Sequence, residues 1–190
     1  LKELQDLLDN ATEENISSTC QRIIEHKLIN TFLPDFFVMA IFHRKERCKD
    51  EANQMLQQFA PKALLDCIRH EDDFIYATER EVADILEQTV VIEGFDTEKL
   101  AKLLVKRISI GGLYCLENEI LTAKEVLEAS LFTDWAGRQV MNLKNFCLTK
   151  LPEEIGLFPD IDILYIDGND FEEVPSALQN IKDLKGLYWD

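Results

Sequence analysis

Two pairs of histidine and cysteine residues have a spacing that could bind a metal ion. His43 precedes Cys48 by five positions, and Cys67 precedes His70 by three. Two thiolates and two imidazoles suit a tetrahedral zinc ion, and residues three apart share one face of a helix. The His43–Cys48 spacing is not a usual zinc knuckle. The sequence therefore predicts no metal site and no cofactor, and these four residues are the candidates if a metal is bound.

Other chemical motifs are incomplete or absent from the sequence. Asp160, Asp162, Asp167 and Asp170 do not follow the D-x-[DN]-x-[DN]-G order of a calcium loop. The sequence contains neither of the glycine-rich loops that bind nucleotide phosphates, and it has no G-x-S-x-G nucleophile motif. We therefore expect no catalytic residues and no enzymatic activity.

The composition excludes some classes of partner. The net charge is −16, and acidic residues are in excess in both the N-terminal and C-terminal parts. Nucleic acids and anionic membranes would be repelled, which favours another protein or a peptide, in particular a basic one, as the partner. No run of eighteen apolar residues occurs. The five cysteines are odd in number and widely spaced, which predicts reduced thiols and a cytoplasmic protein.

The C-terminal segment 140–190 contains an internal repeat with a period of about 23 residues. Leu164 and Ile166 alternate with Tyr165 and Asp167, which predicts a short strand with one buried face. The amide of Asn169, at the following turn, can bond backbone groups of neighbouring turns. The repeated apolar residues are Met141, Leu143, Leu148, Leu151, Ile155 and Phe158 in the first row, Leu164, Ile166, Phe171, Val174, Leu178 and Ile181 in the second, and Leu184, Leu187 and Trp189 in the third.

This spacing resembles the leucine-rich repeat, in the variant whose return arm carries Leu-Pro. The segment 161–171 matches the signature of that family at every fixed position. Phe146 replaces the asparagine of the first repeat, which suits a repeat that packs on a preceding domain. Trp189 could cover the open end of the core. The resemblance implies parallel strands and a structural role for Leu143, Leu148, Leu151, Leu164, Ile166, Asn169, Phe171, Val174, Leu187 and Trp189.

The resemblance also implies where a partner binds. In this family the solvent-facing strand residues line a concave face and meet the partner. Tyr165 and Tyr188 occupy equivalent positions of successive repeats and would stack in one column, which makes them a candidate hot spot. A short array could instead serve only as structure. The implied partner-binding residues are Asn142, Lys144, Asp162, Tyr165, Asp167, Lys185 and Tyr188.

Residues 1–135 have the apolar periodicity of helices. A segment at 51–58 is echoed thirty positions later at 81–88, and helix pairs at this period resemble HEAT-type α-solenoid units. An irregular helical bundle is the alternative. Thr78 with Glu81, and Thr122 with Glu125, have the spacing of capping boxes. We expect an apolar cluster to plug the open first repeat, formed by Leu131, Phe132 and Trp135.

These patterns predict an α+β fold in which residues 1–135 form an all-α domain, HEAT-like or otherwise. Residues 136–190 would then form two leucine-rich repeats and the start of a third, with parallel strands. The predicted function is that of a non-catalytic scaffold or adaptor that binds a protein through its concave face. One alternative is a metal-dependent or enzymatic helical domain regulated by the repeats. Another is a structural module that forms homodimers through the exposed repeat edge.

Overall fold

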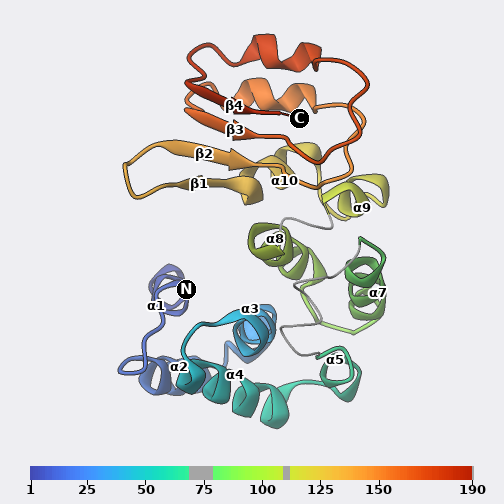
Figure 1. The fold of residues 1–190 in the computed structure, drawn as a ribbon. Helices are drawn as coiled ribbons and strands as arrows, with labels where there is room; N and C mark the ends of the chain where they lie inside the picture. The colour runs from blue at the N-terminus through green and yellow to red at the C-terminus, as the bar shows by residue number, and fades with distance from the viewer. Residues whose placement is uncertain (69–78, 109–111, 190) are drawn as a thin grey trace. The chain divides into compact units, whose positions relative to one another are not determined.

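The computed structural model describes residues 1–68, 79–108 and 112–189 (Figure 1). Helices occupy the N-terminal part and a four-stranded sheet the C-terminal part, so the predicted α+β class is confirmed. No helix in the described residues is long and apolar enough to cross a membrane. The helices are α1 (Lys2–Asp9), α2 (Ile16–Glu25), α3 (Ile29–Phe42), α4 (Glu46–Phe59), α5 (Lys62–Leu65), α7 (Glu79–Val90), α8 (Thr97–Ile108), α9 (Gly112–Glu117) and α10 (Ala123–Ser130).

The chain divides into two compact units. The N-terminal unit comprises Leu1–Ala77 and Asp84–Leu103, and the C-terminal unit comprises Thr78–Ala83 and Leu104–Asp190. The predicted ranges were 1–135 and 136–190. The difference arises because α10 packs on α9, on the strand β2 (Gln139–Asn142) and on the 3-10 helix η1 (Glu153–Leu157), so α10 belongs to the same core as the sheet.

An apolar helix, α3, forms the centre of the N-terminal unit. Every residue from Phe32 to Ile41 is buried, and α4 packs against this helix. Pro34 lies inside α3, five residues after its first residue, Ile29. A proline inside a helix loses one backbone hydrogen bond, and burial of the surrounding phenylalanines offsets that loss. The resemblance to HEAT units remains a prediction.

A buried ion pair joins three helices of the N-terminal unit. Asp35 of α3 is almost completely buried, and Lys99 Nζ of α8 lies 2.5 Å from its Oδ2 atom. The Asp35 Oδ2 atom accepts no hydrogen bond of good geometry. The other carboxylate oxygen, Oδ1, accepts a hydrogen bond from Gln5 Nε2 of α1 at 2.7 Å. Lys99 also donates to Gln5 Oε1 and to the Thr31 carbonyl. Burial raises the pKa of the Asp35 carboxyl, and the positive charge of Lys99 partly offsets the rise.

The sheet of the C-terminal unit has the order β1-β2-β3-β4 (Figure 1). The strands β2, β3 and β4 are parallel, and their register pairs Val140 with Ile163 and Ile163 with Gly186. These partners occupy equivalent positions of successive repeats, so the internal repeat matches the strand register. The remaining elements are β1 (Leu131–Thr133), β2 (Gln139–Asn142), β3 (Ile163–Tyr165), β4 (Gly186–Tyr188) and the 3-10 helices η1 (Glu153–Leu157) and η2 (Ser176–Asn180).

The first repeat packs on α9 through Phe146. This ring is fully buried, and a Cβ atom added at Gly112, the first residue of α9, would lie 2.3 Å from its Cδ2 atom. Only a residue without a side chain allows so close an approach. The structure thus places Phe146 against the preceding helices, in the position where the next repeat carries Asn169.

The expectation that Leu131, Phe132 and Trp135 plug the first repeat is wrong for Phe132 and Trp135, which are exposed, whereas the half-buried Leu131 lies opposite the buried Met141. Leu131 and Phe132 belong to β1, which pairs antiparallel with β2. Trp135 lies in the turn between these strands and is 94% exposed. The edge of β2 is covered by backbone pairing with β1, so no large side chain is needed to cover it.

Candidate functional site

The sheet has one face turned away from the core, which we call the outer face. Phe132 lies opposite Val140 in the register, and side chains two residues apart point to the same side of a strand. By the same alternation, Leu164 and Ile166 of the second repeat point inward and are buried. The outer face carries Phe132 of β1, Val140 and Asn142 of β2, Ile163 and Tyr165 of β3, and Gly186 and Tyr188 of β4, and of these seven residues Val140 and Ile163 are buried.

A stacked pair of tyrosines occupies the outer face. The ring centroids of Tyr165 and Tyr188 are 4.4 Å apart, and the ring planes differ by 16°. Tyr188 is 51% exposed and Tyr165 is half-buried. A shallow hollow of about 350 Å³ adjoins the pair, and it is lined by Lys144, Tyr165, Asp167, Leu187, Tyr188 and Trp189. The structure therefore brings Lys144, Asp167 and the two predicted tyrosines together.

The charged residues predicted for the partner-binding face form ion pairs with one another. Lys144 pairs with Asp167, and Lys185 pairs with Asp162. The Lys185 bond, together with the backbone N–H of Gln139, lowers the pKa of the Asp162 carboxyl. These carboxylates connect adjacent repeats, so they offer little charge to a basic partner.

Asn169 lies at the turn after β3, where the repeat pattern placed it. Its Nδ2 atom donates to the carbonyl oxygens of Leu143 and Ile166, each at 2.8 Å. Its Oδ1 atom accepts from the Leu148 backbone N–H at 3.0 Å. One side chain thus satisfies three backbone groups from two successive repeats.

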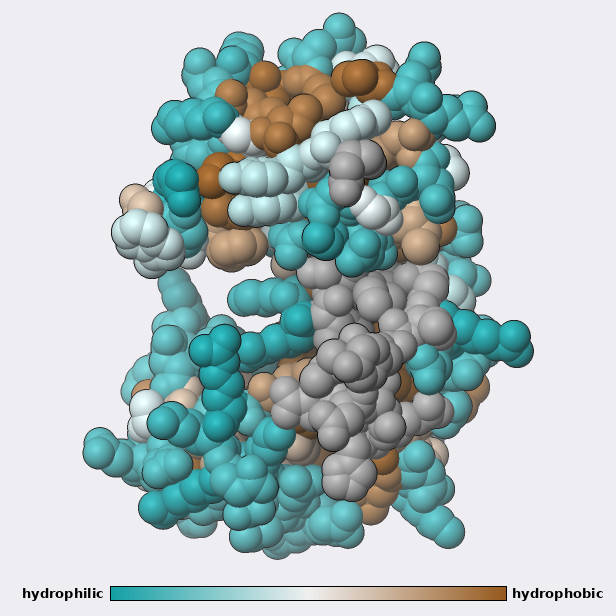
Figure 2. All heavy atoms as spheres, in the orientation of Figure 1, coloured by the Kyte–Doolittle hydropathy of each residue, from teal (hydrophilic) through white to brown (hydrophobic). Residues whose placement is uncertain are grey.

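The predicted structural positions of the repeats are only partly buried. Leu143, Leu148, Leu151, Leu164 and Ile166 lie in the core. Val174 is 69% exposed although its counterpart Leu151 is buried, and Leu187 and Trp189 are also exposed. Phe171 is half-buried and stacks on Trp189, with centroids 5.6 Å apart. In the described residues β4 is the last strand of the sheet, and apolar side chains gather at this end of the sheet in Figure 2.

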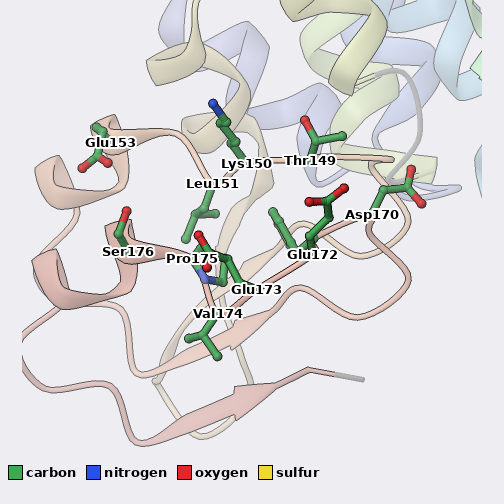
Figure 3. A pocket seen from close by; sticks show the side chains of 11 residues that line it. Thr149, Lys150, Leu151, Glu153, Asp170, Glu172, Glu173, Val174, Pro175 and Ser176 are labelled. Atoms are coloured by element: carbon green, nitrogen blue, oxygen red, sulfur yellow. The ribbon is translucent and has the colours of Figure 1, made fainter.

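A second hollow lies beside the return arms of the repeats. It has a volume of about 860 Å³ and lies between the loops that follow β2 and β3 (Figure 3). Leu151 and Val174 come from equivalent positions of the two loops and contribute apolar surface. We call it the side groove. Its charged residues are Lys150, Glu153, Asp170, Glu172 and Glu173.

The candidate metal ligands are not assembled in the described part of the chain. No group of three potential ligands lies close enough to hold an ion among those residues. His43 Nδ1 accepts from the Lys45 backbone N–H at 3.1 Å, and the Cys67 thiol donates to the Ala63 carbonyl. His70, like Thr78 of the first predicted capping box, lies outside the described residues.

Cys147 should be the only cysteine that reacts rapidly with a thiol reagent in the folded protein. Cys20, Cys48, Cys67 and Cys115 are buried thiols, whereas Cys147 is exposed. Burial raises the pKa of Cys20 to about 12 and also raises that of Cys48, which leaves little reactive thiolate. A colorimetric thiol assay should count one fast thiol. Cys147→Ser should abolish it, and two or more fast thiols in the native protein would contradict the structure.

The hairpin between β1 and β2 is a feature that the sequence analysis missed. The Asp134 carboxylate accepts from the backbone N–H groups of Ala136 and Arg138, both at 2.9 Å, and from the Arg138 guanidinium. Gly137 follows with a φ of +80°. The Asp134-x-x-Gly137 spacing was the available signal for this turn. The ordered turn holds the exposed Trp135 and adds Phe132 to the outer face.

Comparison with known proteins identified no relative of this chain. No protein-family model matches the chain, and no match was found among curated proteins or among solved structures.

Proposed function

We propose that this chain is a non-catalytic scaffold or adaptor of leucine-rich repeat type that binds another protein through the outer face of its sheet. The observation that carries the proposal is the stacked pair of the half-buried Tyr165 and the exposed Tyr188, which lies beside a shallow hollow. Tyrosine is enriched at binding hot spots because it combines a large apolar surface with a hydroxyl group. The strand register, which follows the period of the sequence repeat, and the three bonds of Asn169 support the resemblance to leucine-rich repeats.

The net charge supports a class of partner, and the cysteines support a cellular location for the protein. The acidic net charge supports a protein or peptide as partner over nucleic acid or an anionic membrane. The side groove, with Asp170, Glu172 and Glu173, is a separate acidic surface that lies outside the proposed binding site. Reduced, mostly buried thiols support a cytoplasmic location as part of the proposal.

Self-association through β4 is the second candidate function, and one observation favours it. The Gly186 N–H donates to Asp162 and the Tyr188 carbonyl accepts from Ile166, so both groups point toward β3. Because backbone groups alternate along a strand, those of Leu187 point to the opposite edge, which could pair with a second copy. No observation on the described residues favours a metal-dependent or enzymatic helical domain, and metal analysis of the purified protein would test that alternative.

Tyr165→Ala/Tyr188→Ala should weaken binding of a captured partner by at least about tenfold, because truncating a hot-spot tyrosine commonly costs more than about 1 kcal/mol. The measurement is a pull-down with the whole chain, followed by titration of the captured protein. Light scattering on each variant reports self-association, and circular dichroism reports folding.

Glu172→Ala/Glu173→Ala is the matched control, because it changes two exposed residues of the side groove. It should leave binding unchanged. Loss of binding in this control alone would place a basic partner in the side groove. If both variants behave like the unmodified chain and all three form the same dimer, β4 pairing is the function and the outer face is not the binding site.

A further inference from the structure

The outer face carries no charged residue at any of its seven strand positions. Its two aliphatic members, Val140 and Ile163, are buried, so the accessible surface comes from the three aromatic residues, Asn142 and Gly186. Charged residues flank these positions along the strands, and they pair with each other as Lys144–Asp167, Lys185–Asp162 and Arg138–Asp134. A chain with a net charge of −16 therefore presents a neutral strip for contact, and the nearby Arg138 guanidinium, which also interacts with both tyrosines, is paired with Asp134. Binding to this strip should depend little on salt, unlike binding of a basic partner.

We propose, on the basis of the proposed function, that the outer face receives an extended, uncharged and proline-rich segment of the partner protein. The four strands span three spacings of about 4.8 Å, or roughly 14 Å. A polyproline II segment rises about 3.1 Å per residue, so about five residues cross the sheet. An α-helix satisfies its backbone carbonyl groups internally, so it offers none of them to the hydroxyls of Tyr165 and Tyr188.

The hydrogen-bonding groups of the outer face also match such a segment. Among the described residues no hydrogen bond joins the Tyr165 or Tyr188 hydroxyl to another group, although Arg138 interacts electrostatically with both, so both hydroxyls can donate to a ligand. A polyproline II segment makes no internal hydrogen bonds, so its carbonyl groups can accept these bonds, and prolines bring no N–H groups to be desolvated. Aromatic side chains supply flat apolar surface for the pyrrolidine rings, as in other domains that bind proline-rich segments.

The test is a nuclear magnetic resonance titration of the whole chain with an end-capped proline homopeptide of about ten residues. We expect saturable shifts in residues 163–165 and 186–188, and in the indole N–H of Trp189, which lines the hollow. The Trp135→Phe variant assigns the two indole signals. Tyr165→Ala/Tyr188→Ala should lose at least about tenfold in affinity while keeping a dispersed spectrum. Raising the salt from about 50 to about 500 mM should change the affinity less than about twofold.

Two comparison peptides of equal length sharpen the result. A glycine–serine peptide should not bind, and an arginine–glycine peptide should bind more weakly than the proline peptide. The inference is overturned if the proline peptide gives no saturable shift, if its shifts map to the side groove, or if the arginine peptide binds more tightly. If a captured partner still requires the tyrosines while the proline peptide fails, the proposed function stands and only this inference falls.

Discussion

Lys99→Met should lower the free energy of unfolding by about 3–5 kcal/mol at neutral pH, because it leaves a buried carboxylate without its cation. Asp35 lies in the apolar core around α3, and Lys99 supplies the only positive charge within ion-pair distance among the described residues. Methionine keeps much of the length and apolar volume of lysine, so most of the effect should be electrostatic. Urea unfolding followed by far-ultraviolet circular dichroism measures the loss.

The loss in Lys99→Met should shrink as the pH falls from neutral toward about 4, the ordinary range of a carboxyl group. Burial already raises the Asp35 pKa in the folded protein, so protonation of this group favours the folded state. Its stabilising contribution is complete below the unfolded-state pKa and is lost as the pH rises through the folded-state pKa. Removing Lys99 raises the folded-state pKa further and widens this pH range.

Two further variants separate charge from packing. Asp35→Asn/Lys99→Met should recover much of the lost stability and should remove this pH dependence. Lys102→Met, on the same helix, changes an exposed pair with Glu98 and should cost no more than about 1 kcal/mol. Equal losses in Lys99→Met and Lys102→Met would show that the Asp35–Lys99 pair does not stabilise the N-terminal unit.

Asn169→Ala should lower the stability of the C-terminal unit by about 2–4 kcal/mol. The substitution removes three hydrogen bonds and leaves two backbone carbonyls and one N–H unpaired at a half-buried turn. Trp135 and Trp189 are the two tryptophans of the chain, and both belong to this unit. Urea unfolding followed by tryptophan fluorescence therefore reports on the repeats.

Asn180→Ala is the matched control for that measurement. The Asn180 amide makes a single exposed hydrogen bond, to Glu153 of the preceding repeat, and its loss should cost no more than about 1 kcal/mol. If Asn169→Ala is no more destabilising than Asn180→Ala, the asparagine does not hold successive repeats together.

The sequence predicted those features that a local spacing determines. The period of the internal repeat predicted the strand register, and it placed Asn169 at a turn whose backbone groups need partners. The Thr122–Glu125 spacing predicted the capping box at the start of α10. Each of these follows from a fixed spacing, either the period of the repeat or one helical turn.

Features that depend on tertiary contacts could not be predicted in this way. No local pattern shows that Asp35 of α3 would be paired with Lys99 of α8, or that the Phe146 ring would lie against Gly112. The apolar surface of Trp135 predicts a place in the core, but the Asp134 carboxylate orders a turn that exposes this residue. The lysines beside the neutral strip are neutralised by carboxylates of the neighbouring repeat, and these ion pairs follow from the strand register.

Side-chain footprinting with hydroxyl radicals, on the chain alone and with its captured partner, tests the central claim most directly. Oxidation of Tyr165, Tyr188 and Phe132 should fall on binding, because these exposed or half-buried rings lie on the outer face. Oxidation of Val174 in the side groove should not change. Protection of Val174 with unchanged oxidation of the two tyrosines would contradict a binding site on the outer face.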